Sequence, residues 1–281
     1  MGRADLHMHT TASDGALSPE DMMLAIDGLN IRYKEHIGHN YLDVVGVSDH
    51  NTVEGGYRAK NFALKENFGF EVVVCEEITS LDGHILAVDI KSNIPKLMSS
   101  KDTIEHIHSQ GGLAIAAHPY TIANIAGKTG FKGVKGLIKT QNFDAVETIN
   151  SNPTEFFNNI YAHIVNSGGF KDYFNNAIDH IIGGRTSGSF HNYWPHLANH
   201  GRLAEVGNSD SHFPGSLEKV WTEFPGITFQ EYKAALLAKK TIPKGHIWGI
   251  FQLGHYLKDR KIMKEYYSRE PKYEARISVR A

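Results

Sequence analysis

The chain has 281 residues and a formal net charge of −2, from 29 lysine and arginine residues against 31 aspartate and glutamate residues. This length suits a single α/β barrel with a substantial core, and the near-neutral charge argues against long nucleic acids and membranes as partners. We therefore expect one domain spanning residues 1–281, with a small molecule as its substrate.

The cysteine and hydropathy patterns favour a cytoplasmic protein. The single cysteine, Cys75, rules out an intramolecular disulfide and a cysteine-based zinc site. No signal-peptide pattern opens the sequence, and no stretch of about 18 apolar residues occurs that would cross a membrane. The oligomeric state is left open.

Short apolar runs alternate with helical patterns along the chain. A strand is expected at residues 4–9, followed by a helix that Ser18 caps and that ends near residue 30. Further strands are expected at 42–48, 70–75, 84–89, 113–117, 143–149 and 203–207, and further helices at 52–65, 100–110 and 229–240. This alternation predicts a parallel sheet, open or closed into a barrel.

Two segments do not fit this alternation. Residues 152–200 are irregular and rich in aromatic residues and histidine, and we expect them to form an insertion of helices and loops that caps one end of the sheet. Residues from about 250 to 281 are expected to form a charged surface helix and tail.

Polar side chains directly follow the apolar runs. His50 follows the run at 42–48, Glu77 closes the run that begins at 70, His118 follows 113–117, and Asp210 and His212 follow 203–207. In parallel α/β folds the carboxyl ends of the strands meet on one face, where active sites form. Four separate strands therefore bring metal-binding groups to one place.

His7 and His9 support the same conclusion. Residues at i and i+2 on a strand point to the same face, so this pair is able to chelate one ion. Together with the groups at the strand ends, the pair predicts a metal-dependent hydrolase.

The ordered motifs of the chain resemble those of the PHP family, named for its polymerase and histidinol phosphatase members. The motifs are DLHMHT at 5–10, SDG at 13–15, SDHNT at 48–52, EIT at 77–79, HIL at 84–86, AHP at 117–119 and SDSH at 209–212. The resemblance covers residues 4 to 245, and it implies a distorted (β/α)7 barrel of seven parallel strands. It also implies two to three divalent ions, of zinc, manganese or iron, at the carboxyl ends of the strands.

The resemblance implies nine ligands when it is carried over position by position. A first metal is held by His7, His9, Glu77 and Asp210, a second by Glu77, His84 and His118, and a third by Asp14, His50 and His212. We assign His7, His9, Asp210 and His212 to the catalytic centre. Asp14 stands where some relatives have histidine, so the third site is expected to be weaker or to select another metal; His84 has a strand-capping role as its alternative.

Glu76 is chemically equivalent to its neighbour Glu77. The family pattern places the ligand directly before Ile-Thr, and two adjacent side chains on a strand face opposite sides of the sheet. We therefore choose Glu77.

The charges of such a site favour a phosphoryl group. Three divalent ions carry six positive charges against three carboxylates, which leaves about three positive charges to attract a polyanion. A metal-bound hydroxide then attacks phosphorus in line. The sequence thus predicts hydrolysis of a phosphomonoester or a terminal phosphodiester, in a nucleotide or a short oligonucleotide rather than a long nucleic acid.

Supporting residues and competing functions are also predicted. Arg185, His191 and His196, in the insertion, are candidates for binding substrate, with packing of the insertion as their alternative role, and Glu147 and Asn150 are candidates for orienting the metal ligands. The competing functions are a histidinol-phosphate-type phosphatase, an amidohydrolase-like enzyme that cleaves C–N or C–O bonds, and a non-catalytic PHP accessory module.

Overall fold

The computed structural model describes residues 1–119, 122–123, 131–132, 138, 141–151, 201–217 and 219–245. The predicted insertion at 152–200, with Arg185, His191 and His196, lies outside the described residues, as does the predicted tail at 250–281. Among the described helices, none has both the length and the apolar character needed to cross a bilayer.

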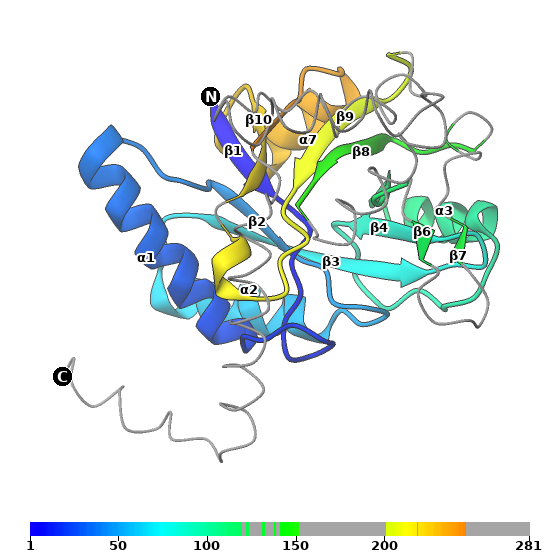
Figure 1. Cartoon of the computed structure of the whole chain (residues 1–281), viewed down its shortest axis with the longest axis horizontal. Coiled ribbons are helices and arrows are strands. Elements are labelled where there is room, and N and C mark those ends of the chain that lie inside the picture. The colour runs from blue at the N-terminus through cyan, green and yellow to red at the C-terminus, as the bar shows by residue number, and fades with distance from the viewer. Residues whose placement is uncertain are drawn as a thin grey trace, which may run out of the picture.

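Nine strands of the described chain form one sheet that curls into a nearly closed barrel (Figure 1). In order across the sheet these are β11 (Ile242–Gly245), β10 (Val220–Phe224), β1 (Gly2–Asp5), β2 (Val44–Val47), β3 (Glu71–Thr79), β4 (His84–Val88), β5 (Leu113–Ala116), β8 (Ala145–Asn150) and β9 (Ala204–Asn208). A side chain also connects β10 to β9, the strand at the other edge of the sheet. The Thr222 hydroxyl of β10 accepts from the Gly207 N–H of β9 at 2.9 Å and donates to the Gly207 carbonyl at 2.8 Å. The predicted barrel is confirmed.

The sheet is mixed rather than fully parallel. The strands β1, β2, β3, β5, β8, β9 and β11 run in one direction, whereas β4 and β10 are each antiparallel to both of their neighbours. The expectation of only parallel βα units is therefore wrong at residues 84–89. The connection between β3 and β4 is a short turn, in which the Ser80 N–H donates a hydrogen bond to the Gly83 carbonyl at 3.0 Å. Such a turn can join only antiparallel strands, because a parallel connection needs a dozen or more residues.

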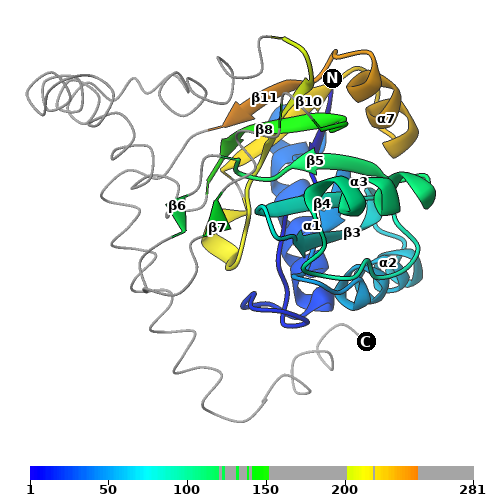
Figure 2. The same cartoon turned by 90° about the vertical axis from the view of Figure 1, so that its right-hand side faces the viewer.

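Within the described residues, four helices pack against this sheet: α1 (Pro19–Ile37), α2 (Glu54–Glu66), α3 (Ser100–Ser109) and α7 (Phe229–Leu237). Figure 2 shows α3 lying along β4 and β5. Ser18 caps α1 as predicted and accepts from the Asp21 N–H at 3.0 Å, but the helix continues to Gly38, whose φ of 84° ends it. The predicted end near residue 30 was wrong, because Gly28 stays within the helix and the Asn30 side chain bonds to the Leu42 backbone at 2.9 Å instead of ending the helix. The short elements β6 (Ile122–Ala123), β7 (Phe131–Lys132) and the 3-10 turn η2 (Pro214–Ser216) complete the described part.

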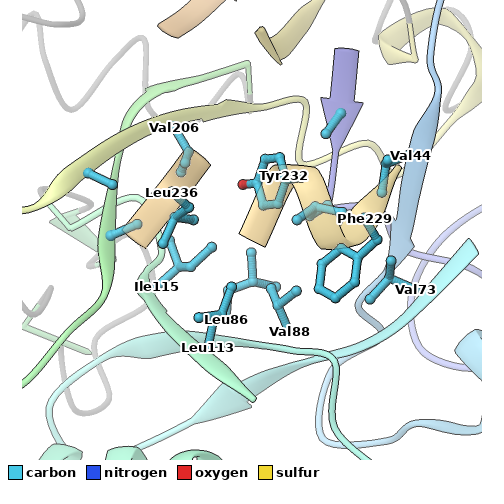
Figure 3. Close-up of a cluster of buried hydrophobic side chains, with 14 of the residues drawn as sticks. Val44, Val73, Leu86, Val88, Leu113, Ile115, Val206, Phe229, Tyr232 and Leu236 are labelled. Atoms are coloured by element: carbon cyan, nitrogen blue, oxygen red, sulfur yellow. The ribbon is translucent and has the colours of Figure 1, made fainter. Parts of the chain in front are cut away.

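The strands β2, β4 and β5 are apolar over most of their length because both faces of the sheet are buried there. Inward-pointing side chains such as Val73, Leu86 and Ile115 surround Tyr232 and Leu236 of α7 (Figure 3). Outward-pointing residues, including Val45, Val47 and Val72, pack beneath α1 and α2.

Helix α7 closes the end of the barrel at which the parallel strands begin. The Phe229 N–H donates to the Glu71 carboxylate at 2.7 Å, at the first residue of β3. Lys233 donates to the Gly111 carbonyl at 2.8 Å, just before β5 starts. The opposite end, where these strands finish, is therefore the end at which polar side chains can gather.

Two glycine substitutions test this packing. A Cβ on Gly46 of β2 would lie 2.7 Å from the Leu6 Cα and 2.9 Å from the Cys75 Sγ, so Gly46→Ala should lower the free energy of unfolding; overpacking of this kind costs about 1–3 kcal/mol. Gly28→Ala is the matched control, because a Cβ there meets nothing within 4 Å, and it should raise the free energy of unfolding by about 0.5–1 kcal/mol through helix propensity. Urea unfolding measures both; a Gly46→Ala protein as stable as the wild type would contradict the close approach of these strands.

Candidate metal centre

The candidate ligands lie where the chain leaves the carboxyl ends of the strands. β1 ends at Asp5, but its path stays extended: Met8 forms a bridge to Ser211, and the His9 N–H donates to the Ser211 carbonyl at 2.8 Å. His50 forms a bridge to Glu77. These links join the segment after β1 to the segment after β9, and the segment after β2 to β3, so residues far apart in sequence meet there.

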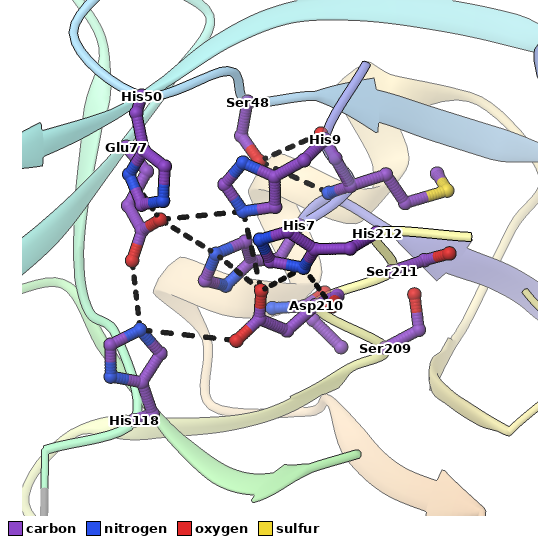
Figure 4. Close-up of polar contacts among 12 residues, drawn as sticks. His7, His9, Ser48, His50, Glu77, His118, Ser209, Asp210, Ser211 and His212 are labelled. Atoms are coloured by element: carbon purple, nitrogen blue, oxygen red, sulfur yellow. Dashed lines mark hydrogen bonds and ion pairs between the residues drawn. The ribbon is translucent and has the colours of Figure 1, made fainter. Parts of the chain in front are cut away.

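All nine predicted ligands come together at this place. Figure 4 shows seven of them converging from different strands. Their ligand atoms form four overlapping groups, each with its atoms within 4.8 Å of one another: His7, His9 and Glu77; His7, His118 and Asp210; His50, Glu77 and His84; and His9, Asp14, His50 and His212.

Glu77 lies at the centre of the convergence and is only 1% exposed. Its Oε1 accepts from His84 Nδ1 at 2.7 Å and from His118 Nε2 at 2.8 Å. Its Oε2 faces His50 Nδ1 at 3.0 Å, His9 Nε2 at 3.3 Å and His7 Nε2 at 3.4 Å. The two oxygens therefore face different sets of imidazoles, as a bridging carboxylate requires.

The predicted choice between the adjacent glutamates agrees with their directions in the structure. Glu76 points to the other side of β3, where its Oε2 accepts from the Ile94 N–H at 2.9 Å. Glu77 alone of the two faces the histidines.

Asp210 is the second buried carboxylate, 4% exposed. Its Oδ1 lies 3.2 Å from His9 Nε2, 3.5 Å from His7 Nε2 and 3.5 Å from His212 Nδ1. Asp210 has a φ of 51° and His118 a φ of 25°, in the left-handed region that side chains other than glycine rarely adopt. Such backbone strain persists where surrounding contacts hold it, and it is common at functional sites.

Asp14 lies at the mouth of the site, and its side chain is 57% exposed. Its Oδ1 lies 3.4 Å from His212 Nε2 and 3.8 Å from His9 Nδ1, and its Oδ2 lies 3.8 Å from His50 Nε2. We call His9, Asp14, His50 and His212 the mouth-side cluster.

The donor set fits divalent cations. The Nε2 of His7 and both ring nitrogens of His9 are buried and have no hydrogen-bond partner, which is costly for polar atoms taken out of water. Their distances of 3.2–3.5 Å to the carboxylates of Glu77 and Asp210 are long for hydrogen bonds. Two donor atoms that each lie about 2.1 Å from one cation are roughly 3.0–3.4 Å apart in octahedral or tetrahedral coordination.

A second layer of buried polar residues holds the histidines. The Glu147 carboxylate, fully buried on β8, accepts from His7 Nδ1 at 2.8 Å and from the His118 N–H at 2.8 Å. It also accepts from the side-chain amides of Asn208 at 2.8 Å and Asn150 at 3.0 Å. A carboxylate on the far nitrogen of a histidine fixes its tautomer and aims the other nitrogen at the metal. Glu147 and Asn150 therefore lie where residues that orient the candidate metal ligands were expected.

Sequence reasoning missed Asn208. It is fully buried on β9, and besides its bond to Glu147 its Oδ1 accepts from the Leu6 N–H at 2.9 Å. It thereby links β9, β8 and the end of β1. The only sequence signal is its position two residues before Asp210, which does not distinguish it from a turn residue.

Burial and the close packing of carboxylates and imidazoles shift the pKa values of several groups in the site. Burial opposes ionisation of Glu77, but the charges of His84, His7 and His50 hold the pKa of this carboxyl well below its usual value. Burial likewise opposes protonation of His212, yet Asp14 and Asp210 raise the pKa of its imidazole to about 9. Burial and the nearby charge of His212 lower the pKa of His9 to about 4. Without cations, the positive charge of protonated imidazoles therefore balances the negative charge of the carboxylates.

No family model matches the sequence. A curated relative, the uncharacterized protein MJ1587 of Methanocaldococcus jannaschii, is 39% identical over 124 residues, which are 42% of this chain and 68% of that protein. This chain belongs to the family of that archaeal protein. The name of the relative states no activity.

Three solved structures are similar in fold. A two-domain protein from Bacteroides vulgatus, described as containing a predicted PHP-like metal-dependent phosphoesterase, has a TM-score of 0.52 at 17% identity and matches 87% of this chain. The chain spans 64% of that protein. PsfC from Pseudomonas syringae has a TM-score of 0.53 at 13% identity, covering 95% of this chain and all of PsfC. An amidohydrolase from Chromobacterium violaceum, solved with sulfate and no metal, has a TM-score of 0.50 at 14% identity, covering 85% of this chain and 97% of that one. At these identities the likeness shows a common barrel fold.

Metal affinity should depend on pH. Because the pKa of His212 is raised to about 9, a cation must displace its proton at lower pH. Affinity is therefore expected to rise between pH 6 and 9, by up to about tenfold per pH unit for one displaced proton, and to level off above that range. Competition with a chelator of known pH dependence measures the affinity, and an indicator in weak buffer measures proton release. An affinity independent of pH would contradict a protonated His212.

Glu147→Gln should weaken metal binding. All four groups that contact the Glu147 carboxylate are donors, so an amide NH₂ in its place has no acceptor and faces two donors. We expect a loss of about 10–100-fold in metal affinity and a lower free energy of unfolding. Glu105→Gln on α3, whose side chain is 65% exposed, is the matched control. Wild-type affinity in Glu147→Gln would show that this carboxylate does not orient His7.

Proposed function

We propose that this protein is a metal-dependent phosphoesterase that hydrolyses a phosphomonoester or a terminal phosphodiester, with a nucleotide or short oligonucleotide as the favoured substrate. We also propose that residues 1–281 act as one domain. The observation that carries the proposal is the pair of buried carboxylates, Glu77 and Asp210, that face the same two histidines at distances suited to a shared cation.

The roles proposed for the residues follow the ligand sets that the resemblance implies, and contacts within each set support them. His7, His9, Glu77 and Asp210 would hold one divalent ion, and Glu77 with His84 and His118 a second. Asp14, His50 and His212 would hold a third. We propose zinc, manganese or iron, because imidazole and carboxylate donors suit these ions. When bound, such ions supply Lewis acidity, which lowers the pKa of water and neutralises charge on a phosphoryl group.

The charge of this donor set supports a phosphorylated substrate. Among the nine groups, the ionisable acids are Asp14, Glu77 and Asp210, and the other six are histidines that bind metals as neutral imidazoles. Three carboxylates do not neutralise three divalent ions, so the loaded site carries about three positive charges. A doubly charged phosphate ester meets this requirement better than a neutral amide does.

The protein itself orients the histidine rings and excludes water from the inner part of the site. His7 and His9 are fully buried, so water reaches the site from the side of His50, His84 and His212, whose side chains are 27%, 24% and 23% exposed. A substrate is therefore expected to approach over these three residues. The proton on His7 Nδ1 is committed to Glu147, which leaves its Nε2 as the ligand atom.

An amidohydrolase-like reaction is the second candidate, favoured by the fold shared with the Chromobacterium violaceum amidohydrolase. The two candidates differ in the bond that is cleaved. Assays of the metal-loaded protein on p-nitrophenyl phosphate, nucleoside monophosphates and bisphosphates, short oligonucleotides and histidinol phosphate, run beside cyclic amides, separate them. Turnover confined to the amides would contradict the phosphoesterase proposal.

His9→Ala and Asp210→Ala should each abolish turnover. Either change removes a donor that faces at least two of the other proposed ligands, so metal content is expected to fall along with activity. His36→Ala is the matched control, because His36 is exposed near the end of α1 and its ring nitrogen contacts only a carbonyl of the same helix. Plasma mass spectrometry of the purified proteins gives metal content, and circular dichroism checks the fold. Unchanged phosphatase activity in either variant would contradict the proposal.

A further inference from the structure

Asp14 differs from the other eight candidate ligands in how it is held. It lies on the loop between β1 and α1, its side chain is 57% exposed, and its distances to the neighbouring imidazoles are 3.4–3.8 Å. The position of its carboxylate therefore depends on what fixes this loop.

The buried residue Asp49 fixes the loop. Its Oδ1 accepts from the Thr10 N–H at 2.7 Å and from the Ser13 hydroxyl at 2.6 Å, and its Oδ2 accepts from the Thr10 hydroxyl at 2.7 Å. Asp49 is 0% exposed, and hydrogen bonds to a buried carboxylate are among the stronger ones in proteins. We call Thr10, Ser13 and Asp49 the loop anchor.

Ser13 connects this anchor to Asp14. Its hydroxyl lies 2.6 Å from Asp49 Oδ1 and 3.4 Å from Asp14 Oδ1. A hydroxyl has one proton to donate, and the shorter contact takes it. Ser13 therefore holds the loop to Asp49 while it leaves the Asp14 carboxylate available to the histidines or to a cation.

The surrounding backbone is shaped to accommodate the anchor. A Cβ on Gly55, in the first turn of α2, would lie 1.8 Å from Asp49 Oδ2 and 2.7 Å from the Thr10 hydroxyl. The loop itself is tightly wound, since the N–H groups of Ser13 and Gly15 both donate to the Thr10 carbonyl, at 3.0 and 2.9 Å. The Ala16 N–H then donates to the His212 carbonyl at 2.8 Å, which ties the loop to a second member of the mouth-side cluster.

We infer that the loop anchor is a positioning device that sets the affinity of the mouth-side cluster for its cation, separately from the cations bound deeper in the barrel. The inference rests on the metal site of the proposed function. Its physical basis is that His7, Glu77, His118 and Asp210 are positioned by strands and by Glu147, whereas Asp14 is positioned by Asp49 through Ser13. Loss of the Ser13 hydroxyl frees Asp14, while His7, Glu77, His118 and Asp210 keep their own supports.

Ser13→Ala is the sharpest test. The change removes one hydroxyl from a half-buried loop residue, so the barrel stays folded, yet it breaks the bond between the Asp14 segment and Asp49. Titration of the metal-stripped full chain with Mn²⁺ or Zn²⁺, followed by calorimetry and by chelator competition, should show one cation bound about 10-fold more weakly. The remaining cations should keep their wild-type affinity. Ser109→Ala, which removes an exposed hydroxyl on α3, is the matched control.

Substitutions of Asp49 give a graded series. Asp49→Ala removes all three acceptor contacts and should weaken the same cation further than Ser13→Ala does. Asp49→Asn should restore much of the affinity, because its Oδ1 still accepts from Thr10 and Ser13 and its NH₂ can donate to the Thr10 hydroxyl. A purely structural role would lower the thermal stability of Asp49→Ala without this selective loss and recovery of one cation.

The outcomes separate the two proposals. If every cation in Ser13→Ala binds with wild-type affinity, or all weaken equally, the inference is wrong even when the wild type hydrolyses phosphate esters. If one cation is selectively lost but the wild type hydrolyses no phosphate ester, the inference stands and the proposed function fails. Binding of no cation by the wild type overturns both.

Discussion

The structure depends on the burial of two carboxylates at one end of the barrel. Glu77 and Asp210 are 1% and 4% exposed, and both point toward His7 and His9, which are fully buried. An isolated ionised carboxylate in such a place costs several kcal/mol, so positive charge has to lie beside it. In the absence of cations, protonated imidazoles provide this charge, and the pKa of His7 is raised well above its ordinary value against the effect of burial, by Asp210, Glu147 and Glu77.

This requirement determines the layer behind the ligands. A histidine that faces two carboxylates needs a fixed ring orientation. For His7, a hydrogen bond from its Nδ1 to the Glu147 carboxylate at 2.8 Å provides this orientation. Glu147 is itself fully buried and receives four hydrogen bonds, two of them from Asn150 and Asn208. The polar network thus extends from the metal ligands into the sheet until every charged oxygen of Glu147 is satisfied. The far end of the barrel is apolar instead, since Phe229, Tyr232 and Leu236 of α7 fill it.

The positions of the candidate ligands could be predicted from sequence because strands impose a simple geometry. An apolar run that ends in a polar residue marks the carboxyl end of a buried strand, so His50, Glu77 and His118 could be located without a structure. The spacing of His7 and His9 holds although β1 ends at Asp5, because the chain remains extended through a bridge at Met8. The nine-stranded sheet was less predictable. β10 and β11 went unpredicted, and the direction of β4 depends on a turn of a few residues after Ser80.

Residues that act through hydrogen bonds were harder to find than those that act as ligands. Asp49, Asn208 and Ser13 are of types that occur in any loop or turn, and nothing in their spacing distinguishes a buried acceptor from a solvated one. Their importance arises from partners that only the fold brings near, such as Leu6 for Asn208, which lies 202 residues away in the chain. Sequence periodicity reports which face a side chain occupies, but it does not report which donors that face meets.

The site therefore combines two kinds of support. Glu77 lies on β3, and Asp210 lies between the end of β9 and the bridge of Ser211 to Met8, so the ladder of the barrel holds both candidate ligands. Little freedom would be lost when a cation binds groups positioned in this way. Asp14 lies on a loop whose anchor is a single carboxylate, so its contribution to binding depends on hydrogen bonds that do not belong to the sheet. A metal centre built in this way has rigid inner ligands and one outer ligand that can be adjusted alone. Changes to the loop between β1 and α1 can thus alter the mouth of the site while the carboxylates that define its chemistry stay in place.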